Sequence, residues 1–132
     1  MAIITLSGIS KVYRTKEIET TALENVNLTV EKGEFISIMG PSGCGKSTLL
    51  NIIGLLDKPT TGTVSLKGEI CNDLSDSRMS HFRNQNLGFV FQSFQLMPRE
   101  SAVENVALPL TFRGEPRKER IKKAACKSSF FI

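Results

Sequence analysis

The most informative segment of the chain is rich in glycine and reads Gly40-Pro41-Ser42-Gly43-Cys44-Gly45-Lys46-Ser47. It matches the pattern G-x-x-x-x-G-K-[S/T], in which a loop joins a strand to a helix and cradles phosphate groups. The five residues before it, 35–39, are nearly all apolar, which predicts a strand buried on both faces of a parallel sheet. The leucines and isoleucines between residues 49 and 56 predict a buried helix after it. The motif therefore lies where a phosphate-binding loop requires it.

The chemistry of such a loop assigns a role to each part. Glycines permit backbone conformations in which successive N–H groups point inward around an anion, and the next helix adds its positive end. Lys46 is expected to contact the β- and γ-phosphates, Ser47 to bind Mg²⁺ through its hydroxyl, and Thr48 to hydrogen-bond a phosphate oxygen nearer the base. The predicted nucleotide-binding residues of this segment are Gly40, Pro41, Ser42, Gly43, Cys44, Gly45, Lys46, Ser47 and Thr48.

Cys44 lies inside the loop and has two interpretations. Either any small residue serves at this position, or the helix N-terminus acidifies the thiol and opens it to oxidation.

The pattern around the loop predicts an α/β protein with antiparallel strands at its N-terminal end. Ser101 and Glu104 form a capping-box pattern that should open a helix, and Pro116 suits the first turn of a last helix over 116–127. The other expected elements are strands at 3–13, 26–30, 63–70 and 87–91, and a short polar helix from Ser75 or Asp76 to about Asn84.

Composition sets limits on the function. The 132 residues, of which 40% are hydrophobic and 23% charged, are enough for one soluble globular domain and exclude a low-complexity chain. No apolar run approaches the roughly 18–20 residues of a membrane span, and residues 1–6 do not have the pattern of a secretory signal. The three cysteines suggest neither a disulfide framework nor a metal motif, which favours a reducing, cytosolic setting.

The excess positive charge is concentrated near the C-terminal end. Residues 113–127 hold seven Lys or Arg and two Glu, whereas the formal net charge of the whole chain is +4. Two interpretations stay open, a solvated helix face and a patch for nucleic acid or anionic lipid.

Several stretches resemble the ATP-binding subunit of an ABC transporter, in the lipoprotein-release and macrolide-export branch. GTPases are a poorer match, because the chain has neither a D-x-x-G element nor an N-K-x-D guanine motif. The resemblance covers residues 3 to about 125, the N-terminal part of the family's domain. It implies a P-loop NTPase core of the ABC ATPase type with N-terminal antiparallel strands, incomplete at its C-terminal end. The matching stretches are 10–13, 40–54, 57–62, 87–94, which resembles the Q-loop, and 102–110.

The resemblance also implies roles for residues outside the phosphate loop. Tyr13 would stack on adenine, and Gln92 would contact nucleotide, Mg²⁺ or the attacking water. Ser47 and Gln92 are thus the expected metal ligands, and ATP and Mg²⁺ the expected cofactors. Residues 93–110 resemble the surface that receives a transmembrane permease subunit. The resemblance implies a second partner, another nucleotide-binding subunit in a head-to-tail dimer. It also implies a cytoplasmic location on the inner face of the cell membrane. No nucleic-acid partner is expected.

The sequence departs from the family pattern beyond the Q-loop. It contains no Leu-Ser-Gly-Gly-Gln signature, no apolar strand ending in Asp-Glu (Walker B) and no switch histidine after them. Residues 126–132 also differ from the amphipathic helix that the family would continue. We therefore expect a domain portion over 1–125 and an atypical tail over 126–132, produced by a truncated or shifted reading frame or representing a natural short form. No catalytic residue is assigned, and little or no hydrolysis is expected from this chain alone.

Two other classes of protein remain for comparison. The chain would be a non-catalytic nucleotide-binding or interaction module if its basic helix at 113–127 served to dock on a partner. A small nucleotide kinase would need an acceptor-binding segment or an Arg-rich lid, and neither is readable here.

Overall fold

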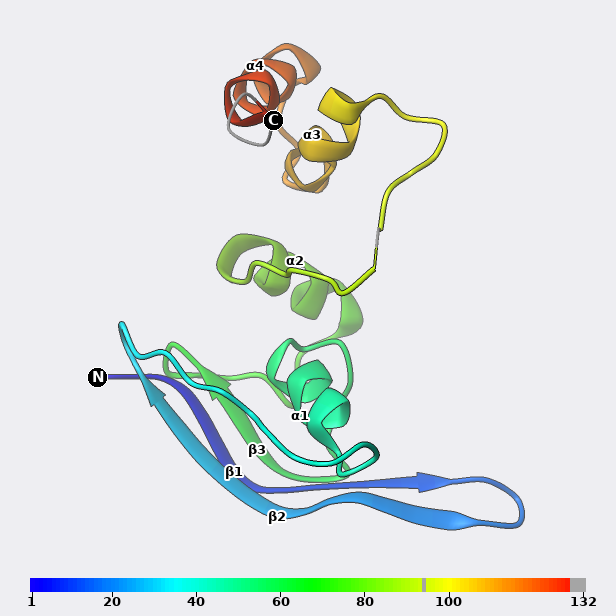
Figure 1. The fold of residues 1–132 in the computed structure, drawn as a ribbon. Helices are drawn as coiled ribbons and strands as arrows, with labels where there is room; N and C mark the ends of the chain where they lie inside the picture. Colours follow the sequence, from blue (N-terminus) through cyan, green and yellow to red (C-terminus); the bar gives the residue numbers. More distant parts are fainter. Residues whose placement is uncertain (94, 129–132) are drawn as a thin grey trace. The chain divides into compact units, whose positions relative to one another are not determined.

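The computed structural model describes residues 1–93 and 95–128, in two compact units over residues 1–79 and 80–132 (Figure 1). The first unit carries the glycine-rich loop, and the second carries Gln92 and the two C-terminal helices.

The first unit is built on an antiparallel sheet with the strand order β2-β1-β3-β4. Strands β1 (Ala2–Arg14) and β2 (Glu19–Glu31) form a long hairpin, in which Ala2 lies opposite Glu31 and Arg14 opposite Glu19. Strand β3 (Thr61–Leu66) pairs with the other edge of β1, and β4 (Glu69–Ile70) closes the sheet. The N-terminal antiparallel strands predicted from the sequence are confirmed.

Helix α1 (Lys46–Ile53) packs on this sheet and completes its core. Ile52 is fully buried, and Leu55 just beyond the helix is 3% exposed. The buried side chains on the strands share an apolar, mostly branched character; they are Leu6, Ile9, Leu23, Val30, Val64 and Leu66. Apolar residues of α1 therefore anchor the helix whose first turn carries the glycine-rich loop.

The second unit is helical. It contains most of α2 (Asp76–Asn86), together with α3 (Ala102–Phe112) and α4 (Arg117–Ser128). The predicted capping box is present, because the Ser101 hydroxyl accepts from the Glu104 N–H and the Glu104 carboxylate accepts from the Ser101 N–H. Arg113 donates to the side chain and carbonyl of Asn84, which ties α2 to the end of α3. The three helices predicted for 75–127 are confirmed.

Two predicted strands are not formed, one of them expected in a parallel sheet. Residues 35–39 and 87–91 are irregular, and Phe35 and Val90 are almost fully exposed. A strand of a parallel sheet needs neighbours for its backbone N–H and C=O groups. Within residues 1–93 and 95–128, no strand pairs with either segment. Apolar composition alone indicated the strands, but strand structure depends on partners.

One predicted strand is divided. The segment predicted over 63–70 becomes β3 and β4, separated by a tight turn at Lys67 and Gly68, both with positive φ. No helix in the described ranges is long and apolar enough to cross a membrane.

Candidate nucleotide-binding site

The glycine-rich loop owes its shape to glycines in the left-handed region. Gly43 has a φ of 80° and Gly45 a φ of 91°. Gly45 also approaches β2 closely, because a Cβ atom placed there would lie 2.4 Å from the carbonyl oxygen of Ala22. The loop is thus fixed against the sheet at its end, while residues 41–44 stay exposed to solvent.

Helix α1 begins immediately after the loop and presents unpaired backbone donors. Gly45 is its N-cap and makes no side-chain capping bond, and no acidic residue occupies the first turn. Within the described ranges, the N–H groups of Lys46, Ser47 and Thr48 have no acceptor. The helix therefore directs uncompensated positive charge towards the loop.

The Lys46 ammonium group bends back over the loop. Its Nζ donates to the carbonyl oxygens of Gly40 at 2.7 Å and Pro41 at 2.5 Å, and lies 3.6 Å from Cys44 Sγ. The two carbonyl oxygens are neutral, so an anionic oxygen in the loop would be a stronger partner for the same ammonium group.

These features fit a phosphate group. A glycine cradle, three free amide donors and an ammonium group converge on one exposed loop, and an anion would satisfy all of them. Ser47 is exposed at the second position of α1, where its hydroxyl is free to meet a cation that accompanies the phosphates, and Thr48 follows it half-buried. The residues predicted from the motif, 40–48, therefore form one continuous surface.

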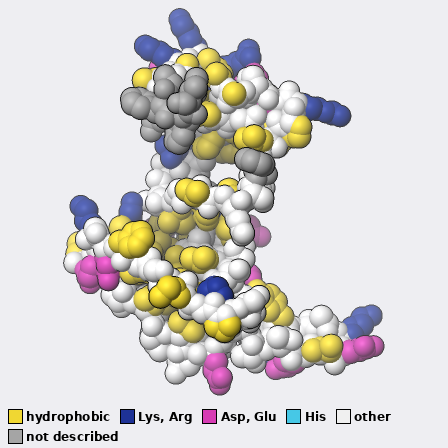
Figure 2. Space-filling view, viewed as in Figure 1, with side chains coloured by type: hydrophobic (Ala, Val, Ile, Leu, Met, Phe, Trp, Pro, Cys, Tyr) yellow, Lys and Arg dark blue, Asp and Glu magenta, His cyan; other side chains and the backbone are white. Residues whose placement is uncertain are grey.

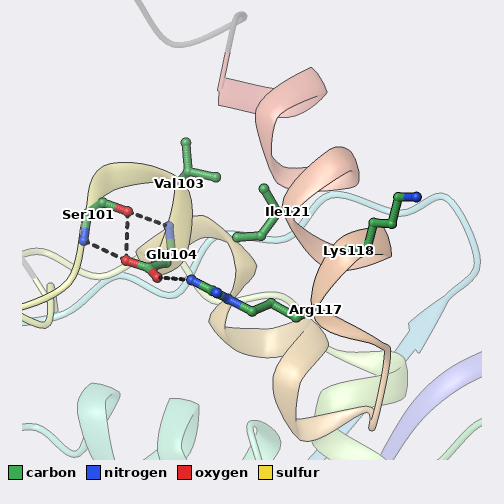
Figure 3. A pocket seen from close by; sticks show the side chains of 6 residues that line it. All are labelled: Ser101, Val103, Glu104, Arg117, Lys118 and Ile121. Carbon is green, nitrogen blue, oxygen red and sulfur yellow. Dashed lines mark hydrogen bonds and ion pairs between the residues drawn. The ribbon is translucent and has the colours of Figure 1, made fainter.

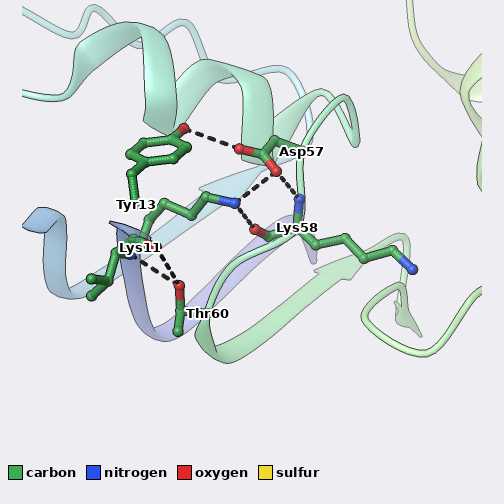
Figure 4. Close-up of polar contacts among 6 residues, drawn as sticks. Lys11, Tyr13, Asp57, Lys58 and Thr60 are labelled. Atoms are coloured by element: carbon green, nitrogen blue, oxygen red, sulfur yellow. Dashed lines mark hydrogen bonds and ion pairs between the residues drawn. The ribbon is translucent and has the colours of Figure 1, made fainter. Parts of the chain in front are cut away.

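Tyr13 lies in the same unit, near the end of β1. Its hydroxyl donates to Asp57 Oδ2 at 3.0 Å (Figure 4), and the residue is 42% exposed. The Lys11 ammonium group lies 5.0 Å from the centroid of the Tyr13 ring and donates to Asp57 Oδ1 at 2.7 Å. A third donor, the Lys58 N–H, contacts the same oxygen at 2.8 Å.

These donors change the protonation of Asp57. Partial burial raises the pKa of the carboxyl group, but the hydrogen bonds from Lys11, the Lys58 N–H and Tyr13 together outweigh it, and the net pKa is lowered. Asp57 is thus held as a carboxylate.

Sequence reasoning missed Lys11 and Asp57 as neighbours of Tyr13. One signal was available, since residues 11 and 13 alternate onto the same face of a strand. No sequence pattern placed Asp57 there, because its position depends on where the chain turns after α1.

Gln92 belongs to the second unit, where it is exposed in an irregular segment. The strand predicted immediately before it, residues 87–91, is not formed. Its contact with nucleotide and metal remains a prediction.

The second unit has a groove of its own between α3 and α4. Glu104 accepts from Arg117 at 3.2 Å across it, and hydrogen bonds from Ser101 and then Arg117 lower the pKa of Glu104 (Figure 3). The lining residues come from the first turns of both helices; they are Ser101, Val103, Glu104, Arg117, Lys118 and Ile121.

Comparison with known proteins shows the family to which the chain is related. The model of the ABC transporter family matches residues 23–130. The ATP-binding protein LolD of a lipoprotein-releasing system from Shewanella denitrificans is 45% identical over 122 residues, which make up 92% of this chain and 52% of LolD. The macrolide export ATP-binding/permease protein MacB from Syntrophobacter fumaroxidans is 46% identical over 114 residues, 86% of this chain and 16% of MacB.

A solved structure supports the same conclusion. The dimeric, post-hydrolysis state of the ATP-binding cassette MJ0796 from Methanocaldococcus jannaschii, bound to ADP and Pi, matches with a TM-score of 0.84 at 49% identity. The match covers 92% of this chain and 54% of that one. The chain therefore spans about half the length of LolD and of MJ0796.

The P-loop NTPase fold of the ABC ATPase type, predicted from the sequence, is confirmed by this similarity. The family match spans more than half of the chain and includes the whole glycine-rich loop. The chain thus belongs to the ABC transporter family and is related to its ATP-binding subunits.

Proposed function

We propose that residues 40–48 bind the triphosphate of Mg-ATP, and that the chain is the nucleotide-binding part of an ABC transporter ATPase that powers export or lipoprotein release.

One observation carries the binding proposal. The free N–H groups at the start of α1 and the Lys46 ammonium group surround the same exposed loop. No neutral ligand would satisfy the free N–H groups and the ammonium group as well as a polyphosphate does.

The metal would enter with the nucleotide. The Ser47 hydroxyl and the Gln92 side chain are its proposed protein ligands, both supplying the oxygen donors that Mg²⁺ prefers. When bound, Mg²⁺ neutralises charge on the phosphates. The protein's own part is to position the phosphates through the loop amides and Lys46, and to hold the base through Tyr13.

The transport role rests on the family. Both LolD and MacB are named for export or release systems. We propose a transmembrane permease subunit as the partner for residues 93–110, which include the rigidly capped start of α3. We also propose a second nucleotide-binding subunit, as in the dimeric MJ0796 structure, and a location on the inner face of the cell membrane.

Equilibrium dialysis with Mg-ATP tests the binding proposal. Lys46→Ala removes the ammonium group from the loop, and we expect it to abolish the binding of Mg-ATP that the wild-type chain shows. Lys32→Ala is the matched control, because Lys32 is an exposed lysine in a turn of the same unit, and it should bind as the wild type does.

Unchanged affinity in Lys46→Ala, or equal losses in both variants, contradicts the proposal.

Binding and hydrolysis are separable here. The sequence contains no signature motif and no Asp-Glu strand end to polarise water, so we expect the purified chain to bind nucleotide weakly and turn it over little or not at all.

A further inference from the structure

The Tyr13 ring is held by contacts that the phosphate loop does not need. Its hydroxyl meets Asp57 at 3.0 Å and its face meets the Lys11 ammonium group at 5.0 Å from the ring centroid. We propose that Asp57, itself held by Lys11, is a positioning residue that fixes the Tyr13 ring as the stacking platform for a nucleotide base. This inference rests on the proposed function and extends it to the recognition of the base.

The geometry fixes the ring at two points. A phenol ring on a strand turns about two side-chain torsions, and a hydroxyl hydrogen bond removes most of the freedom of its far end. The acceptor is a carboxylate, which makes the bond stronger than one between neutral groups. Tyr13 as a whole residue nevertheless remains 42% exposed, so it keeps surface for a ligand.

Asp57 is in turn held in place by hydrogen bonds between its segment and β1. Lys11 is only 13% exposed and donates both to Asp57 and to the carbonyl oxygen of Lys58, at 2.6 Å. Three residues further on, the Thr60 hydroxyl accepts from the Val12 N–H at 2.9 Å, and the Thr60 N–H donates to Ser10 O at 2.8 Å. The segment 57–60 is therefore bonded to β1 on both sides of Lys11.

The anchor also links the two ends of the proposed ligand site. Asp57 lies four residues beyond the end of α1, and Lys46 lies at its start. One helix thus connects the phosphate loop to the residue that orients Tyr13. A rigid connection of this kind fixes the distance between phosphate and base subsites before the ligand arrives, which lowers the entropy cost of binding.

The expected ligand class is a planar heterocyclic base attached to a polyphosphate. An aromatic platform contributes to binding by stacking, and stacking acts on the base and not on the phosphates. Loss of the anchor should therefore weaken ATP binding and leave the binding of inorganic triphosphate unchanged.

Affinities for Mg-ATP and for Mg-triphosphate, measured in parallel by calorimetry, test the inference. We expect Tyr13→Ala to weaken ATP binding by roughly 5- to 150-fold, and Asp57→Ala and Tyr13→Phe to weaken it by about 2- to 10-fold. Triphosphate affinity should not move in any of the three. Asp73→Ala, a change at an exposed aspartate of the same unit, is the matched control and should match the wild type for both ligands.

A spectroscopic measurement reports on the ring itself. Tyr13 is the only tyrosine and the chain has no tryptophan, so intrinsic fluorescence arises from this ring alone. Quenching of its emission by acrylamide should increase in Asp57→Ala, stay unchanged in Asp73→Ala, and return towards the wild-type value in Asp57→Asn, whose amide oxygen still accepts from the phenol.

The outcomes separate the two proposals. Wild-type ATP affinity in both Asp57→Ala and Tyr13→Phe, or equal losses for ATP and triphosphate, overturns the positioning role. A wild-type chain that binds neither ligand overturns the proposed function instead, and the quenching comparison then still decides whether Asp57 holds the ring.

Discussion

Cys44 connects the chemistry of a single side chain to the proposed ligand. Its thiol is exposed, its Sγ lies 3.6 Å from Lys46 Nζ, and it faces Gly40 so closely that a Cβ there would lie 2.6 Å from the sulfur. A polyphosphate in the loop would cover this sulfur and draw the ammonium group away from it.

We therefore expect Mg-ATP to slow the alkylation of Cys44 by iodoacetamide. Peptide mass spectrometry resolves the three cysteines, so Cys126, which is exposed in α4, serves as an internal control whose rate should not change. Cys71 is buried, and burial raises the pKa of its thiol, so it should react slowly with or without nucleotide. If nucleotide leaves the rate at Cys44 unchanged, the phosphates do not occupy the loop.

Asp57 makes the free energy of unfolding depend on pH. Because its pKa in the folded state lies below the unfolded value, its contribution is fully present above the unfolded pKa of roughly 3.9 and is lost as pH falls through the folded pKa. We expect Asp57→Asn to unfold more easily in urea at pH 7, by on the order of 1 kcal/mol for a carboxylate that is still one-third exposed. The difference from wild type should shrink below about pH 4. A difference that stays constant down to pH 3 would show that the charge of Asp57 is not involved.

The glycine-rich loop offers a matched pair of backbone positions. Gly43 and Gly45 both have positive φ, but only Gly45 lies against β2. Alanine at either position carries strain of about 1–2 kcal/mol. At Gly45 the added Cβ would in addition lie 2.4 Å from the Ala22 carbonyl oxygen, whereas nothing lies within 4 Å of it at Gly43.

Gly45→Ala should accordingly destabilise the chain in urea more than Gly43→Ala does, and weaken Mg-ATP binding more. Equal effects of the two substitutions would mean that contact with β2 does not fix the end of the loop.

The local elements were predictable where the signal was local. The capping box at Ser101 and Glu104 and the periodicity of α1 identified their helices from a few residues each. Residues 35–39 and 87–91 carried an equally clear apolar pattern but formed no strand, because strands of a parallel sheet need partners that lie far away in sequence. The phosphate loop was predictable because its motif is local, with all of its residues consecutive in the sequence. The contact of Asp57 with Tyr13 was not, since it joins residues 44 apart.

Several large apolar side chains of the described residues are exposed to solvent. Phe35 is 93% exposed and Met39 87%, on the irregular segment that precedes the loop. Figure 2 shows hydrophobic side chains reaching the surface in both units. Exposed large apolar side chains favour association when they lie close together, and Phe35 and Met39 are four residues apart on one segment.

We expect the purified chain to self-associate as its concentration rises, as measured by sedimentation velocity. Phe35→Lys should shift the distribution towards monomer, whereas Ile18→Lys should not, because Ile18 is an exposed apolar residue isolated at the tip of the β1–β2 hairpin. Identical behaviour of both variants would place the associating surface elsewhere.

One loop of the backbone, residues 40–48, is proposed to bind a polyphosphate. A crystal structure of the chain with a non-hydrolysable ATP analogue and Mg²⁺ tests it most directly. We predict phosphate density within hydrogen-bond distance of the N–H groups of Gly45, Lys46, Ser47 and Thr48, with the Lys46 ammonium group turned from the carbonyl oxygens of Gly40 and Pro41 onto the phosphates. Density for the analogue elsewhere, with Lys46 still bonded to those two carbonyl oxygens, would contradict the account.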